Sequence, residues 1–101
     1  MPTATARIGD KILATSSTYA TVEGNVYFPP SAISDPSVFR PSNTHSTCPW
    51  KGTASYYDVT VDGGATTLRN AAWYYPAPKD KAAHIKDHVA FYTNKVNVSV
   101  A

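Results

Sequence analysis

The reactive side chains of this sequence are concentrated in residues 46–52, which read STCPWKG. This segment holds the single cysteine, Cys48, and a cation, Lys51, within one short turn. A nearby cation favours the thiolate form of cysteine, which is its nucleophilic form. Free cysteine is also among the most frequently buried residues. The spacing therefore fits a pocket wall, a nucleophile or a buried structural cysteine.

A thiol-dependent enzyme is the alternative to a pocket. It would use Cys48 as the nucleophile, His45 or His88 as the base, and Lys51 to stabilise the developing charge. The sequence contains no local signature that pairs either histidine with Cys48. We therefore prefer a pocket wall to a nucleophile and leave open whether the chain is an enzyme.

Aromatic residues supply the other candidate site groups, at 12% of the chain. In a strand over residues 71–75, Trp73 and Tyr75 share one face and Tyr74 takes the other. Rings that carry hydroxyl groups, placed beside a cation, make a pocket with apolar walls and polar handles. We expect this pocket to bind a small molecule, either anionic or polyhydroxylated. Its predicted lining is Cys48, Lys51, Tyr56, Trp73 and Tyr75.

Metals, cofactors and nucleic acids are not expected partners. His84 and His88 would share a helix face, but the segment around His88 has the pattern of a strand, and the chain has no C-x-x-C pair. The formal net charge is only +2, and the basic residues are scattered from Arg7 to Lys95. A surface that follows phosphates needs such residues clustered.

The sequence also indicates the compartment and the domain organisation. One cysteine cannot close an intramolecular disulfide, residues 1–7 lack the apolar core of an export signal, and no apolar stretch is long enough to span a bilayer. We expect a cytoplasmic protein without membrane contact, formed by a single domain over residues 1–101. A domain of this size buries only about two-thirds of its unfolded surface, so we expect a homodimer.

Apolar and polar residues alternate with period two in several segments, which predicts strands with one buried face. Turn residues separate these segments at 23–25 and 62–64, helical turns are expected at 30–33 and 79–85, and residues 34–47 are expected to form a surface loop. The predicted fold is mainly β: a compact antiparallel sandwich or barrel-like sheet with one or two short helical turns. The predicted strands are 11–15, 19–22, 26–28, 55–61, 71–75, 88–92 and 96–100.

The alternation also sorts side chains between faces. Tyr57, Val59 and Val61 are predicted on the core face of their strand, with Tyr56 on the opposite face. The segments 12–15 and 96–101 are expected to leave free strand edges that pair with another chain. A β-edge interaction module is thus the third class of function that the sequence allows.

Four motifs extend the argument beyond single residues: TCPWKG at 47–52, ASY at 54–56, NAAWYYPAP at 70–78 and VAFY at 89–92. Their spacing resembles the domain of unknown function family 427, over nearly the whole chain. The resemblance implies a small, mostly β domain and no established activity. Trp50 stands where the family pattern commonly has tyrosine, which keeps a ring and loses its hydroxyl. The residues that carry the family motif here are Cys48, Lys51, Gly52, Tyr56, Trp73 and Tyr75.

Overall fold

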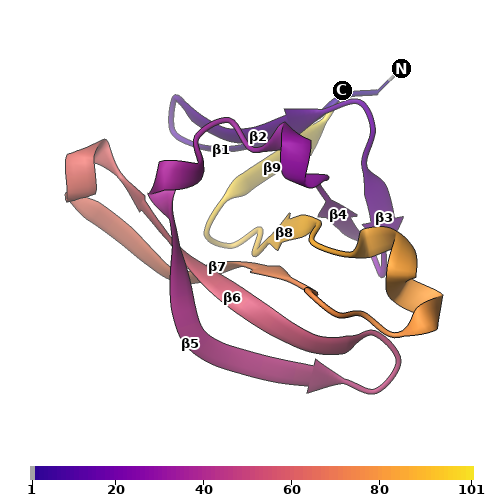
Figure 1. Ribbon diagram of the computed structural model, residues 1–101. Coiled ribbons are helices and arrows are strands. Elements are labelled where there is room, and N and C mark those ends of the chain that lie inside the picture. Colours follow the sequence, from indigo (N-terminus) through magenta and orange to yellow (C-terminus); the bar gives the residue numbers. More distant parts are fainter. Residues whose placement is uncertain (1) are drawn as a thin grey trace.

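The computed structural model describes residues 2–101, which form strands and short 3-10 turns without an α-helix (Figure 1). A three-stranded antiparallel sheet in the order β2-β1-β9 brings the two ends of the chain side by side. The Thr3 N–H donates to the Ala101 carbonyl over 2.8 Å, and the Ala101 N–H donates to the Thr3 carbonyl. The strands of this sheet are β1 (Ala4–Ile8), β2 (Lys11–Ser16) and β9 (Asn97–Val100).

A four-stranded antiparallel sheet in the order β5-β6-β7-β8 forms the other layer. It is joined to a small hairpin of β3 and β4 by a backbone bridge in which Phe28 and Val89 exchange two hydrogen bonds of 2.8 Å. The strands of the four-stranded sheet are β5 (Phe39–Cys48), β6 (Gly52–Val61), β7 (Thr66–Tyr74) and β8 (Val89–Phe91), and those of the hairpin are β3 (Ala20–Val22) and β4 (Asn25–Tyr27). The 3-10 turns are η1 (Pro30–Ala32), η2 (Pro36–Val38), η3 (Asp62–Gly64) and η4 (Asp80–Ile85).

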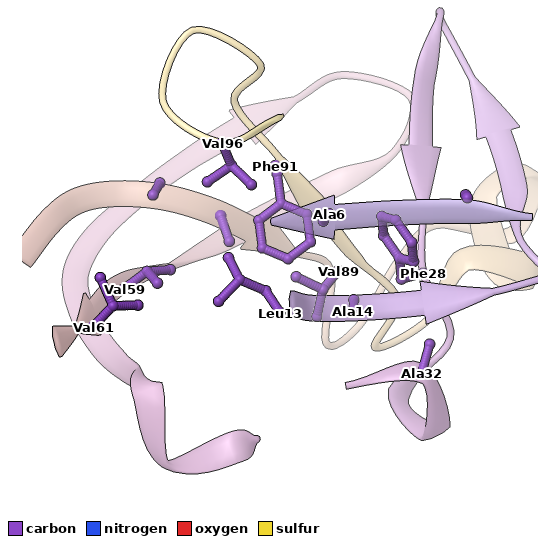
Figure 2. Close-up of a cluster of buried hydrophobic side chains, with 13 residues drawn as sticks. Ala6, Leu13, Ala14, Phe28, Ala32, Val59, Val61, Val89, Phe91 and Val96 are labelled. Carbon is purple, nitrogen blue, oxygen red and sulfur yellow. The ribbon is translucent and has the colours of Figure 1, made fainter. Parts of the chain in front are cut away.

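The main core lies between the two larger sheets. Figure 2 shows Leu13, Val59 and Phe91 entering it from three different strands, together with Phe28 from the bridge that follows β4. β1 contributes two alanines with no exposed surface, Ala4 and Ala6, and the partly buried Ile8. Tyr57, Val59 and Val61 all belong to this core or pack against it, as the alternation of β6 predicted.

A second cluster occupies the opposite face of β6 and β7, under the β3–β4 hairpin and η4. At its centre Tyr27, which has no exposed surface, packs edge-on against Trp73 with ring centroids 6.2 Å apart. The Trp73 indole N–H donates to the Tyr27 hydroxyl over 3.2 Å. This bond satisfies a buried donor, so the cluster contains two large polar rings without an unpaired polar group on either.

The mainly-β, antiparallel, single-domain prediction is confirmed, and the sheets do not close into a barrel. Most predicted strands and turns are present, and the predicted turn at 23–25 is the β3–β4 hairpin loop. Its central residues Glu23 (φ 54°) and Gly24 (φ 80°) are both left-handed, as a type I′ turn requires. No helix among residues 2–101 has the length and apolar character that crossing a membrane requires.

The prediction of a surface loop at 34–47 is wrong, because β5 begins at Phe39 and η2 precedes it. β5 is the outer strand of its sheet and is exposed along most of its length, so its sequence lacks an apolar period. Pro41 is tolerated at such an edge and lies where the register with β6 shifts. β1 was also not predicted, since its two fully buried positions hold alanine, which is depleted in strands and gives a weak apolar alternation.

Free strand edges were predicted at 12–15 and 96–101. The first segment lies within β2 and the second includes β9, and these are the two outer strands of their sheet. An isolated bridge between Ala14 and Ile33 covers part of β2. Val100 of β9 is 49% exposed. Pairing of either edge with a second chain stays a prediction.

Replacing Tyr27 by Phe should lower the free energy of unfolding by about 1–3 kcal/mol, because the buried Trp73 indole N–H loses its acceptor. Urea denaturation at neutral pH measures the change. Tyr19→Phe is the matched control, since the Tyr19 hydroxyl has no hydrogen bond among the contacts of residues 2–101 and its ring only packs on the main core. Equal stability of the Tyr27→Phe variant and the wild type would contradict this account of the second cluster.

Candidate functional site

The site is built on the turn that joins β5 to β6. Cys48 pairs with Gly52 across the hairpin, so Pro49, Trp50 and Lys51 form its loop. Gly52 has φ 116°, and a side-chain Cβ there would lie 3.3 Å from the Ala77 carbonyl oxygen. The glycine of the TCPWKG motif is therefore required by the close approach of the chain's own backbone, in a conformation that L side chains rarely adopt.

The segment after β7 holds this turn in place from one side. The Lys79 N–H donates to the Lys51 carbonyl, and the Lys79 ammonium donates to the Pro49 carbonyl, both over 2.8 Å. Two hydrogen bonds to adjacent parts of the loop fix its path and the direction in which the Lys51 side chain leaves it. The turn is a rigid support rather than a mobile loop tip.

Lys51 is only 7% exposed, and its side chain lies against the rings of the second cluster. Its ammonium donates to the carboxylate of Glu23, which comes from the β3–β4 turn. The same nitrogen lies 5.3 Å from the Trp50 ring centroid and 5.7 Å from that of Tyr75. The cation is therefore held by one carboxylate and two aromatic faces, which is how a buried charge is made tolerable.

The protonation of this ion pair follows from its surroundings. Burial disfavours the charged form of Lys51, but the hydrogen bond to Glu23 and the neighbouring Tyr27, Tyr75 and Cys48 outweigh it, so the pKa of Lys51 is raised. The hydrogen bond from Lys51 is the main reason that the pKa of Glu23 is lowered. Both groups stay charged throughout the neutral range, and the lysine charge is already compensated.

A hollow of about 410 Å³ opens beside Lys51. We call it the Lys51 hollow. Tyr56 and Tyr92 form one wall, with nearly parallel rings 6.4 Å apart and hydroxyl oxygens 3.5 Å apart, and the Tyr92 ring lies 4.7 Å from that of Trp73. Tyr75 and Phe91 complete the aromatic lining. The polar side chains at this hollow, apart from Lys51, are Asn25, Thr93 and Asn94.

Four of the five predicted site residues, Lys51, Tyr56, Trp73 and Tyr75, border this single hollow. The fifth, Cys48, does not border it. Cys48 is half-buried and packs against the second cluster from the end of β5. That these residues bind a ligand stays a prediction.

Sequence reasoning missed the remaining lining residues. Tyr92 was assigned to the end of a strand without a site role, although it belongs to the VAFY motif. Asn94 follows it in an irregular segment, and Asn25 was interpreted only as a turn residue. The motif offered a signal for Tyr92, whereas the two asparagines reach the hollow only through the tertiary fold.

The histidines proposed as bases for Cys48 make other contacts. His45 Nδ1 lies 3.3 Å from the Ser55 hydroxyl, and a regular register from His45 to Cys48 places these two side chains on opposite faces of β5. His88 Nδ1 lies 2.9 Å from the Lys86 carbonyl. A nucleophilic role for Cys48 stays a prediction.

Within residues 2–101, no three His, Cys, Asp or Glu side chains gather closely enough to hold a metal ion.

Comparison with known proteins identifies one family. A family model described as "Domain of unknown function (DUF427)" matches residues 4–101, which is nearly the whole chain and includes every motif quoted above. No curated protein matches the chain.

The Glu23–Lys51 pair predicts a pH dependence of stability. The pKa of Glu23 is lower in the folded state than the ordinary glutamate value of 4.5. The ionised carboxylate therefore adds to the free energy of unfolding at pH values above 4.5, and this contribution is lost as the pH falls through the folded pKa. The Glu23→Gln variant should therefore be less stable than the wild type at pH 7, and the difference should shrink at pH 3. Urea denaturation at both values measures it.

Lys11→Gln is the control for this experiment. It removes the cation of the other ion pair, Lys11–Asp35, whose side chains are exposed at 44% and 38%, whereas in the Glu23–Lys51 pair the carboxylate is 50% exposed and the lysine only 9%. A solvated pair contributes little, so this variant should remain close to the wild type. A Glu23→Gln variant as stable as the wild type at pH 7 would show that Lys51 does not need its carboxylate.

Proposed function

The chain belongs to the DUF427 family, whose description assigns no activity, and we propose that it binds a neutral, polyhydroxylated small molecule in the Lys51 hollow. The observation that carries this proposal is the lining: aromatic side chains, of which Tyr92 is exposed, beside amide and hydroxyl side chains and next to a cation that is already paired. The volume of about 410 Å³ lies within the usual range for small-molecule sites.

The aromatic side chains supply a surface for the apolar face of such a ligand. Tyr92 is 38% exposed, although it is a large ring that contacts both Tyr56 and Trp73. Its pKa is raised to about 12, first by the hydrogen bond with Tyr56 and then by burial, so the hydroxyl stays protonated and able to donate. A sugar-like ring presents C–H groups on its faces, and a rigid aromatic surface excludes water from them.

The polar side chains favour a neutral ligand over an anion. Asn25 and Asn94 each offer both donors and acceptors, which matches hydroxyl groups that also do both. A carboxylate or phosphate ligand only accepts, and the positive charge of Lys51 that would attract it is already compensated by Glu23. Of the two ligand classes predicted from the sequence, the polyhydroxylated class therefore fits this lining better.

Isothermal titration calorimetry with a panel of neutral disaccharides tests this function, with glucuronate as the anionic comparison. At least one disaccharide should bind saturably and more tightly than glucuronate. Tyr92→Ala should weaken that binding about fivefold or more, since it removes the exposed ring, and loss of one aromatic contact costs of order 1 kcal/mol. The fold should tolerate this change because the ring lies at the surface.

Ile12→Ala on β2 is the matched control, since it also removes a large exposed side chain, at 43%, from the other sheet. It should leave the affinity unchanged. Absence of binding by every neutral disaccharide, or equal loss of affinity in both variants, would remove the support for this function.

A further inference from the structure

A second hollow, of about 440 Å³, opens on the other face of the β6–β7 pair. Tyr57 and Tyr74 line it, and each directly follows a residue of the Lys51 hollow in its strand. Side chains alternate between the faces of a sheet, so the two hollows lie on opposite faces. The second hollow is therefore separate from the Lys51 hollow, and we call it the Asp87 hollow.

Aromatic rings and prolines make up most of its lining. The Tyr57 and Tyr74 rings stack with centroids 4.7 Å apart and planes 18° apart, and the Phe39 ring meets Tyr57 edge-on at 5.6 Å. Burial raises the pKa of Tyr57 to about 12, which agrees with a poorly hydrated wall. Pro30, Pro36 and Pro41 border the same space, and their fixed backbone torsions leave little freedom to be lost on binding.

Asp87 is the one charged residue in this lining, and it forms no ion pair with any residue of the chain from 2 to 101. Its neighbours Lys86 and His88 do not border the hollow. Asp87 has φ 61°, a left-handed conformation that is uncommon for a residue other than glycine, and its N–H donates to the Tyr75 carbonyl over 3.0 Å.

We propose that the Asp87 hollow binds a small organic cation, namely an ammonium group on an apolar body. The Asp87 carboxylate pairs with the ammonium, and Phe39, Tyr57 and Tyr74 cover the apolar part. A carboxylate and aromatic ring faces both attract positive charge, so the electrostatics of this lining favour a cation and disfavour an anion. The apolar body is required as well, because a bare inorganic ion cannot remove the apolar surface of the rings and prolines from water.

The test is a ¹H–¹⁵N NMR titration of the whole chain with benzylammonium, compared with benzyl alcohol, a neutral ligand of similar size and shape. Benzylammonium should shift signals around Tyr57, Tyr74 and Asp87 saturably. Benzyl alcohol should bind about fivefold more weakly, the difference that one solvated ion pair supplies at most.

Asp87→Asn then removes the charge while preserving the backbone, since asparagine adopts the left-handed conformation readily. It should weaken benzylammonium binding, toward the affinity of benzyl alcohol, without changing the melting temperature. Asp10→Asn is the matched control. Asp10 is exposed, lies outside this lining and has no ion pair in residues 2–101, so its replacement should change neither the benzylammonium affinity nor the melting temperature.

Equal binding of the two ligands by the wild type would overturn the proposal without any variant. So would unchanged benzylammonium affinity in Asp87→Asn, absence of binding, or signal shifts confined to other parts of the chain. None of these outcomes depends on the Lys51 hollow, so the inference stands or falls separately from the proposed function.

Discussion

The antiparallel pairing of β6 with β7 is the constraint on which the rest of this structure depends. Tyr56 lies opposite Trp73 in that register, and Tyr57 lies opposite Ala72. Tyr57 and Ala72 therefore face the main core, whereas the adjacent residues Tyr56 and Trp73 face the second cluster. A shift of the register by one residue would exchange the two faces and abolish both at once. Asn70 (φ 51°) interrupts the pairing at a bulge, where its N–H bonds to the Asp58 carboxylate at 2.8 Å.

The buried cation is the second element of the site that the fold determines. Lys51 is brought to Glu23 by two tight turns, one in each hairpin. The Glu23 side chain is half exposed, whereas that of Lys51 is 9% exposed, so loss of the carboxylate would leave a poorly hydrated ammonium without its counter-charge. Neutralisation of the Lys51 charge by Glu23 also bears on the proposed ligand. A lysine that is already paired with a carboxylate attracts an anion weakly, but its fixed side chain can contact a neutral ligand.

Local patterns in the sequence were sufficient for most strands, for the Glu23–Gly24 turn and for the faces of Tyr57 and Trp73, because period two and turn chemistry are properties of adjacent residues. β5 escaped prediction because an exposed edge strand needs no apolar period. The Glu23–Lys51 pair escaped because its members are 28 residues apart in sequence. Cys48 was grouped with the pocket on proximity in sequence alone, and the fold leaves it outside the lining of the hollow.

The most direct test of the central claim is to locate bound ligand on the chain by ¹H–¹⁵N NMR, using whichever neutral disaccharide binds most tightly. Saturable shifts are expected around Lys51, Tyr56, Trp73 and Asn94, with the signals of Ile33, Phe39 and Asp87 at the other hollow unchanged. Shifts centred on the Asp87 hollow, or none at all at saturating disaccharide, would contradict binding in the Lys51 hollow.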